Sequence, residues 1–256
     1  MTTQKEKAEL FTGLHVKGDP IILFNIWDAG SAKAVAEAGA KAIATGSWSV
    51  AAANGFSDAE AVPLDLALDN ITRIVHAVDL PVTLDFEAGY TVDIDTLKAN
   101  IARVVNTGAI GINFEDQIIG GEGMYSVEDQ SKRITAIREA ASDKGIPLFI
   151  NARTDVFLKN GPETHREHFE EAVTRALAYT KAGASSIFAP GLKDPDLIRD
   201  LCERSPLPVN IMVMADTPSN AEMAALGVGR ISYGPGPYRQ MIEGLKTAAG
   251  QVFNGK

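Results

Sequence analysis

The 256-residue chain contains a single cysteine, Cys202, and this scarcity already excludes several kinds of protein. One thiol cannot close an internal disulfide, and it cannot supply the several cysteines of a cysteine-based zinc site. No apolar run reaches the length of a membrane span. The first ten residues are polar and lack the apolar segment of a secretory signal. We therefore expect a cytoplasmic protein that has no membrane partner.

Positive charge is also scarce. The 24 lysines and arginines are outnumbered by 33 aspartates and glutamates, so the formal net charge is -9. Such a balance argues against nucleic acid or an anionic membrane surface as a partner. It does not argue against a small anionic substrate, because a bound cation can invert the local field.

Eight short apolar runs alternate with segments of helical periodicity. Each run is almost continuously hydrophobic, which is typical of a parallel strand buried on both faces. Eight alternations in 256 residues predict a (β/α)8 TIM barrel made of one domain, residues 1–256. The rival is a doubly wound open sheet, but no Gly-x-Gly-x-x-Gly follows the first run. The runs are Ile21–Trp27, Lys41–Gly46, Pro81–Glu87, Ala109–Asp116, Pro147–Asp155, Ser185–Gly191, Pro208–Val213 and Arg230–Gly234.

The third run carries two carboxylates two residues apart, Asp85 and Glu87. Residues i and i+2 of a strand point to the same face, so both acids are expected to project together. Neighbouring buried acids are costly unless a cation lies between them. With Glu115 at the end of the next run, they form an oxygen-only ligand set that suits Mg²⁺ or Mn²⁺.

Other polar residues also gather where the runs end, which is the functional end of a barrel. Arg153 offers a permanently charged fork for a carboxylate or phosphonate, although a structural salt bridge with Asp155 or Glu115 is the alternative. The backbone amides of Gly46–Trp48 are placed to take a second carboxylate oxygen. The asparagines Asn113, Asn151 and Asn210 either contact substrate or support the residues that do.

Two connections are long, Ser47–Pro63 and Gln117–Val127. The second is rich in glycine, and we expect Gln117–Tyr125 to be a mobile lid that ligand orders.

Seven segments resemble those of one enzyme family, in the same order and with barrel spacing. The chain is similar to the phosphoenolpyruvate mutase and isocitrate lyase superfamily from Ile22 to about Tyr238. The matching segments are Trp27–Ala32, Thr45–Ser47, Asn54–Asp58, Leu84–Tyr90, Gly111–Asp116, Asn151–Asp155 and Pro208–Asn210.

The resemblance implies a fold, a cofactor and a set of roles. It implies an α/β barrel, often a homodimer or homotetramer that exchanges its last helix between subunits. It implies an Mg²⁺-dependent site for small 2-oxo acids, with enolpyruvate-type intermediates. On matching positions it makes Asp85, Glu87 and Glu115 the metal shell, and gives Asp58, Arg153 and Glu115 catalytic roles. Substrate contacts fall to Trp27, Gly46, Ser47, Trp48, Asn113, Arg153 and Asn210.

The departures from the family pattern narrow the reaction. The lid of the lyases contains a catalytic cysteine with lysines and a histidine, whereas Gln117–Ser126 has none of these residues. Ala189 stands where the mutases place a histidine, and Cys202 is expected to be an inert, buried residue of the helix after the sixth strand. We therefore expect little cleavage of isocitrate or methylisocitrate.

Three functions stay open. The first is cleavage of a carbon–carbon bond in an oxaloacetate-like dicarboxylate. The second is a phosphonopyruvate-type mutase or hydrolase that acts on a phosphorus–carbon bond. The third is a barrel that binds a 2-oxo acid without turnover.

Overall fold

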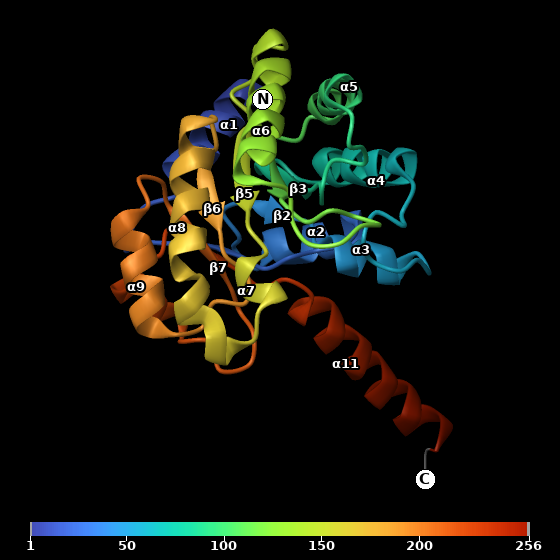
Figure 1. The fold of residues 1–256 in the computed structure, drawn as a ribbon. Coiled ribbons are helices and arrows are strands. Elements are labelled where there is room, and N and C mark those ends of the chain that lie inside the picture. Colours follow the sequence, from blue (N-terminus) through green and yellow to red (C-terminus); the bar gives the residue numbers. More distant parts are fainter. Residues whose placement is uncertain (1, 255–256) are drawn as a thin grey trace.

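A computed structural model describes residues 2–254 and places eight parallel strands inside a layer of helices (Figure 1). The strands are β1 (Ile21–Leu23), β2 (Ile43–Ala44), β3 (Val82–Asp85), β4 (Gly111–Glu115), β5 (Phe149–Arg153), β6 (Ser186–Phe188), β7 (Val209–Met212) and β8 (Arg230–Ser232). The helices are α1 (Gln4–Gly13), α2 (Ala29–Glu37), α3 (Ser47–Ala53), α4 (Leu64–Ala77), α5 (Ile94–Asn106), α6 (Val127–Asp143), α7 (Val156–Lys159), a 3₁₀ turn η1 (Pro162–Thr164), α8 (His165–Lys181), α9 (Pro195–Arg204), α10 (Asn220–Ala225) and α11 (Gly236–Phe253).

The sheet topology is that of a barrel. The strand order is β1-β8-β7-β6-β5-β4-β3-β2, and every named pair is parallel. The two outer strands meet through one parallel bridge between Ile26 and Thr45, so the barrel is nearly closed. Each of the eight predicted runs contains one strand, and the predicted (β/α)8 fold is confirmed.

Burial on both faces explains why the runs became strands. All five residues of β4 are buried, because their side chains alternate between the barrel interior and the surrounding helices. Helix α4 presents an apolar stripe that includes Leu68, Ile71 and Ile74, and it packs in the main core with β3. Helix α9 begins where Asp194 caps the chain and Pro195 occupies the first turn.

Helices α1 and α3 are among the elements that the sequence did not predict. Helix α1 is amphipathic only through Ala8 and Phe11, which pack against residues at the amino ends of the strands. Its start is stabilised by a capping box between Thr3 and Glu6. The short helix α3 begins directly after β2, so the predicted long connection from Ser47 is partly helical.

The last helix departs from the rest of the chain. Helix α11 extends away from the barrel as an isolated rod (Figure 1), and Pro237 is its one buried residue. Its apolar residues Leu245, Val252 and Phe253 are 61%, 78% and 85% exposed. Within residues 2–254, no helix has both the length and the apolar character that crossing a membrane requires.

Candidate active site

A cavity of about 190 Å³ opens at the carboxyl ends of the strands. Its lining combines polar and apolar side chains, and among residues 2–254 one arginine is the only cationic side chain that lines it. The lining residues are Asn25, Gly46, Ser47, Trp48, Ser49, Asp58, Asp85, Asn113, Arg153, Leu158, Phe188, Met212, Ser232, Gly234 and Pro235. The structure therefore brings seven predicted site residues together, from Gly46 to Arg153.

Asp85 is held at the floor of this cavity by neighbouring strands. Its backbone amide donates to Thr45 Oγ1 at 2.8 Å, and its Oδ2 accepts the Ser47 amide at 2.9 Å. Its Oδ1 lies 3.4 Å from Asn113 Nδ2. The Gly46 amide donates to the Ile26 carbonyl, so the amides of Gly46 and Ser47 already have partners within the protein.

The expectation that Asp85 and Glu87 project from one strand face is wrong. Strand β3 ends at Asp85, and Glu87 lies beyond it with a φ of 50°. The chain turns there, and Glu87 Oε2 accepts the Glu60 amide at 2.7 Å. The two carboxyl groups are still close enough for the charge of Asp85 to raise the pKa of Glu87.

Glu60 holds Glu87 and the turn after β3 in place, and the sequence analysis missed it. Its Oε1 accepts the amides of Ala88 at 3.1 Å and Tyr90 at 2.7 Å, while its own amide holds Glu87. Five non-glycine residues among residues 2–254 have a positive φ, and four of them lie in or next to these hydrogen bonds: Ala59, Glu60, Glu87 and Tyr90. Concentrated backbone strain is typical of functional loops, and no local sequence signal marked this one.

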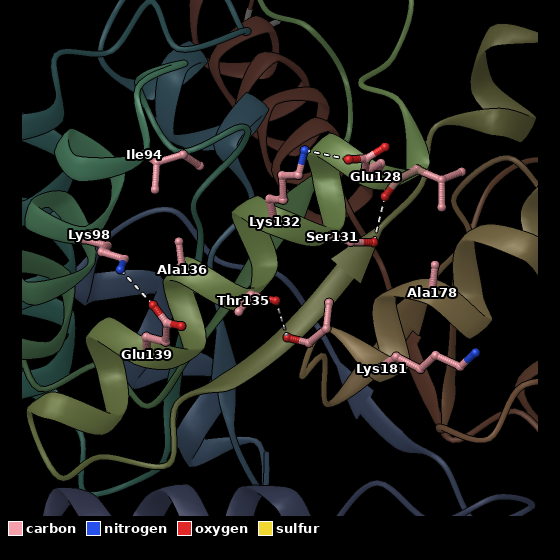
Figure 2. A pocket seen from close by; sticks show the side chains of 12 residues that line it. Ile94, Lys98, Glu128, Ser131, Lys132, Thr135, Ala136, Glu139, Ala178 and Lys181 are labelled. Atoms are coloured by element: carbon pink, nitrogen blue, oxygen red, sulfur yellow. Dashed lines mark hydrogen bonds and ion pairs between the residues drawn. The ribbon is translucent and has the colours of Figure 1, made fainter.

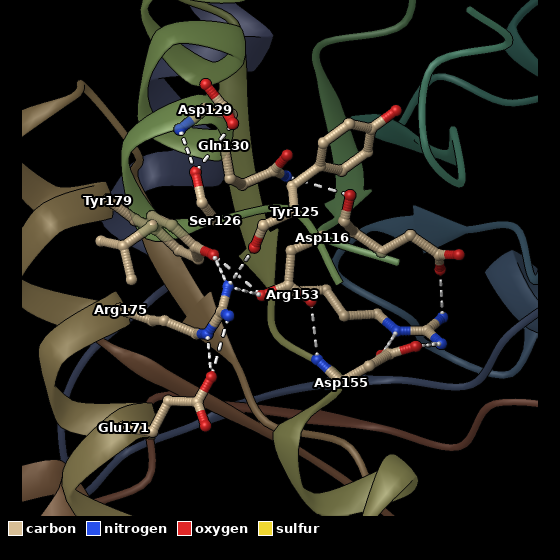
Figure 3. Close-up of polar contacts among 12 residues, drawn as sticks. Asp116, Tyr125, Ser126, Asp129, Gln130, Arg153, Asp155, Glu171, Arg175 and Tyr179 are labelled. Carbon is tan, nitrogen blue, oxygen red and sulfur yellow. Dashed lines mark hydrogen bonds and ion pairs between the residues drawn. The ribbon is translucent and has the colours of Figure 1, made fainter. Parts of the chain in front are cut away.

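Arg153 lies at the end of β5 between two acids, as Figure 3 shows. Its Nε and Nη2 donate to the two carboxylate oxygens of Asp155 at 2.6 and 3.0 Å. Its Nη1 lies 2.7 Å from Glu115 Oε2. Both acids considered as structural partners are therefore engaged, yet the guanidinium still lines the cavity. Each Nη group has a second N–H, so the fork retains donors for a ligand.

The electrostatics of the site reflect a shortage of positive charge. Burial, and then the charge of Asp85, raises the pKa of Glu87 to about 8. Burial also raises the pKa of Glu115, although Arg153 opposes that shift. Asp58 is exposed overall, but nearby atoms desolvate its carboxyl and Asp85 repels its charge, so its pKa is also raised. An added cation would relieve all three groups.

The acids around the cavity do not form a closed metal cage. Among residues 2–254, no three histidines, cysteines or acids are close enough to enclose a metal ion. Mg²⁺ does not need such a cage, because it commonly uses one or two carboxylates together with waters. Asp85 faces the cavity, and Glu87 and Glu115 are buried near it. The chemistry of this oxygen-only set fits Mg²⁺.

Some predicted residues lie outside the cavity lining. Trp27 packs edge-on against Tyr238, with ring centroids 5.0 Å apart, and borders a different hollow beside α11. Asn210 is fully buried, and its Oδ1 accepts the Ser232 hydroxyl at 3.1 Å. Their assignment as substrate contacts stays a prediction.

A buried arginine beneath the cavity was also missed. Arg230 is fully buried, and its Nη2 donates to Asn113 Oδ1 at 3.0 Å. Asn151 Nδ2 donates to the same oxygen at 2.8 Å. Because Asn113 Oδ1 accepts both bonds, its Nδ2 is directed toward Asp85. The sequence placed Arg230 in the eighth run, but an arginine at a strand start carried no functional signal.

A wider hollow lies on the outside of the barrel, between α5, α6 and α8 (Figure 2). Its volume is about 720 Å³, but four of its five charged side chains pair with one another. Lys98 contacts Glu139 and Lys132 contacts Glu128, each at 2.7 Å. This open surface offers no convergent polar groups, so the strand-end cavity is the candidate site.

The chain matches a protein family described as phosphoenolpyruvate phosphomutase over residues 11–253. A proposed phosphonomutase from Burkholderia cenocepacia superposes with a TM-score of 0.93 at 49% identity, covering 99% of this chain and all of that one. The 2-methylisocitrate lyase of Escherichia coli is 26% identical over 257 residues, 96% of this chain and 83% of that protein. Phosphonopyruvate hydrolase, solved with oxalate and Mg²⁺, shares the fold at 21% identity, with a TM-score of 0.85 and coverage of 97% and 87%.

Proposed function

Because the chain belongs to the phosphoenolpyruvate phosphomutase family, we propose that it is an Mg²⁺-dependent enzyme that cleaves a carbon–carbon bond of a small 2-oxo dicarboxylate. Oxaloacetate or an alkylated relative is the substrate we expect, with an enolpyruvate-type intermediate. The observation that carries this choice is the single cation in the cavity lining, Arg153. A phosphonate dianion beside a carboxylate would need more positive charge than this lining offers.

Each residue of the cavity has a role that follows from its position. Arg153 grips one substrate carboxylate through the donors that its acid partners leave free. Asp85 would hold Mg²⁺ directly, and Glu87 and Glu115 would do so through water. Bound there, the cation would stabilise negative charge on the 2-oxo oxygen. The oxalate and Mg²⁺ bound by phosphonopyruvate hydrolase support this ligand class.

The reaction also requires a residue in the cavity wall that can transfer a proton. Asp58 lines the cavity, and its raised pKa suits a group that takes a proton from water and returns it. Asn113 can only donate toward the cavity, because Arg230 and Asn151 occupy its oxygen. We assign Asn113 to a substrate oxygen. The apolar wall of Leu158, Phe188 and Met212 would exclude water from the carbon that is cleaved.

The reaction test compares three substrates. Wild-type protein with Mg²⁺ is incubated with oxaloacetate, phosphonopyruvate and methylisocitrate, and the products are identified by NMR. From oxaloacetate we expect either pyruvate and CO₂, the products of decarboxylation, or oxalate and acetate, the products of hydrolysis. We expect no product when EDTA is present. Turnover of phosphonopyruvate instead would favour the phosphorus–carbon reaction. Binding of oxalate without turnover of any substrate would favour the non-catalytic binder.

The grip on the substrate is tested at Arg153. Arg153→Lys keeps the charge but loses the planar fork, so oxalate affinity measured with Mg²⁺ by calorimetry should fall about tenfold or more. Arg138→Lys is the matched control, since Arg138 bonds the carbonyls of Leu148 and Gly183 far from the cavity. Equal oxalate affinity in wild type and Arg153→Lys would remove this role.

We also propose that the protein is a homo-oligomer, a dimer or tetramer, in which copies exchange α11. The support is that both the helix and the barrel surface that would receive it expose apolar side chains. Helix α11 exposes Leu245 and Val252. Ile22 of β1 and Phe24, which directly follows that strand, are exposed beside a hollow of about 700 Å³. Leu245→Glu should lower the mass measured by light scattering, while Lys246→Glu on the same helix should not. An unchanged mass in Leu245→Glu would contradict the exchange.

A further inference from the structure

A buried ionic cluster that the proposed reaction does not use lies between β4 and α8 (Figure 3). Arg175 Nη1 lies 3.0 Å from Asp116 Oδ2, and the Tyr179 hydroxyl donates to the same oxygen at 2.8 Å. Asp116 and Tyr179 are fully buried, and Arg175 is nearly so. Glu171 closes the cluster on its outer side, 2.8 Å from Arg175 Nη2.

The cluster joins both ends of the glycine-rich loop. That loop leaves β4 at Asp116 and returns at Tyr125, whose amide donates to the Asp116 carbonyl at 2.8 Å. The Tyr125 carbonyl accepts Arg175 Nη1 at 3.0 Å. Tyr125 is held on its other side by Arg133, whose guanidinium stacks 4.4 Å from the ring centre. Tyr125 is therefore part of a pinned base and not of the predicted moving lid.

The loop beyond this base is lightly held. One bridge joins Gln117 to Met124, and the Ile118 amide donates to the Gly123 carbonyl at 3.2 Å. Gly120 and Gly123 have positive φ and meet no neighbouring atom that would confine them. Few contacts would therefore oppose movement of residues 117–124, whereas Asp116 and Tyr125 at the two ends are held in place.

The same cluster reaches the substrate arginine. Asp116 Oδ1 accepts the Asp155 amide at 2.9 Å, and this bond fixes the backbone of Asp155. The Asp155 carboxylate in turn holds the Arg153 fork through two hydrogen bonds. Asp116 therefore has two roles. Its backbone carbonyl holds the base of the loop, and its side-chain carboxylate holds the backbone of Asp155, whose side chain positions Arg153.

We propose that Arg175 is a positioning residue that ties the base of the 117–124 loop to the Arg153 clamp through Asp116. Its guanidinium contacts Asp116, the Tyr125 carbonyl and Glu171, so it holds the two ends of the loop together. The contacts alone define the base of the loop, whereas the link to Arg153 rests on the proposed function, in which Arg153 binds the substrate.

The first measurement follows hydrogen exchange of the Tyr125 and Asp155 amides in the ligand-free, full-length chain. Both amides donate to Asp116, one to its carbonyl and one to its carboxylate. Arg175→Lys keeps the charge but cannot span the three acceptors. Both amides should exchange about tenfold faster, the change expected when one hydrogen bond to a charged group is lost. Tyr179→Phe, which preserves packing, should accelerate the same two amides by a smaller factor.

The matched control is Arg138→Lys, which changes another part-buried arginine outside the cluster. It should leave the Tyr125 and Asp155 amides as in wild type. Unchanged exchange of both amides in Arg175→Lys would overturn the anchor. If Arg175→Lys instead accelerates exchange throughout the chain, unchanged exchange of the two amides in Tyr179→Phe would overturn it.

The second measurement is oxalate affinity in the presence of Mg²⁺. Arg175→Lys should weaken oxalate binding several-fold and raise KM more than it lowers kcat, since a displaced Arg153 mainly costs binding. If wild type itself does not bind oxalate, the proposed function fails while the exchange data still test the anchor. Unchanged oxalate affinity together with accelerated exchange would confine Arg175 to the loop and overturn its link to Arg153.

Discussion

The two ends of the barrel are built from the same strands but have opposite chemistry, and β5 displays both. Its first residue, Phe149, packs edge-on against Phe11 of α1 with ring centroids 5.0 Å apart, and stacks on His15 at 4.1 Å. Its last residue, Arg153, lies between Glu115 and Asp155 beside the cavity. Only three residues lie between the aromatic cluster at one end of β5 and the charged site at the other.

The comparison shows which end of the barrel stabilises the fold and which end destabilises it. At the amino end, α1 closes the barrel with apolar surface, which favours folding. At the carboxyl end, buried acids crowd around Asp85 and raise one another's pKa values, which opposes folding. Substitutions at the two ends should therefore separate stability from activity.

The largest expected effect is at the plug. Phe11→Ala removes a fully buried ring, and the free energy of unfolding should fall by about 3–5 kcal/mol. Turnover per folded molecule should stay close to wild type, because Phe11 lies at the end opposite the cavity. Urea unfolding and activity assays at low temperature measure the two quantities. The exposed neighbour Leu10→Ala is the control, and equal destabilisation by both changes would contradict the plug.

The next effect is at Asp85, and it should have the opposite pattern. Asp85→Asn keeps an acceptor for the Ser47 amide but removes the charge, so turnover should fall roughly 100- to 1000-fold. The free energy of unfolding without metal should stay the same or rise, since Glu87 loses a repelling neighbour. The exposed Asp69→Asn serves as control. Clear destabilisation of Asp85→Asn with full activity would reverse the assignment of the two ends.

A smaller effect concerns pH and His15. Burial, and then the charge of Arg230, lowers the pKa of His15 to about 3, whereas the unfolded chain titrates near 6.5. The unfolded state therefore binds the proton first, and stability is lost as pH falls from 6.5 toward 3, by about 1.4 kcal/mol per pH unit.

The measurement compares unfolding free energies at pH 6.5 and pH 5 in wild type and His15→Phe. We expect wild type to lose about 2 kcal/mol relative to the variant over this interval. His76 has the same contact to a carbonyl four residues earlier but is exposed, so His76→Phe should keep the wild-type slope. Identical slopes in wild type and His15→Phe would show that His15 does not titrate as its burial predicts.

The smallest effect is expected at Cys202. The thiol is buried in α9, as predicted, and burial raises its pKa to about 12, so it is a poor nucleophile and acid. Cys202→Ser should leave turnover unchanged and cost about 1 kcal/mol of stability for the buried hydroxyl. Loss of turnover in a stably folded Cys202→Ser would contradict the reaction proposed here.

What the sequence could predict depended on periodicity. The apolar runs located all eight strands, and polar residues at their ends located Asp85, Asn113 and Arg153 in one cavity. The left-handed turn at Glu87 could not be predicted, because it depends on Glu60, a residue from a different loop. The role of Arg230 was hidden for a similar reason, since its partner Asn113 lies half the chain away.

Helix α11 has a consequence for how this protein would behave on dilution. If copies exchange α11 as proposed, this 18-residue helix packs against another chain, and folding becomes partly a bimolecular event. The midpoint of thermal unfolding would then rise with protein concentration, and mass action would govern a quantity usually treated as a property of one chain. Two related chains mixed during refolding could also exchange this helix. The fraction of hybrids would then measure how strongly the apolar surface at β1 prefers the helix of its own kind of chain.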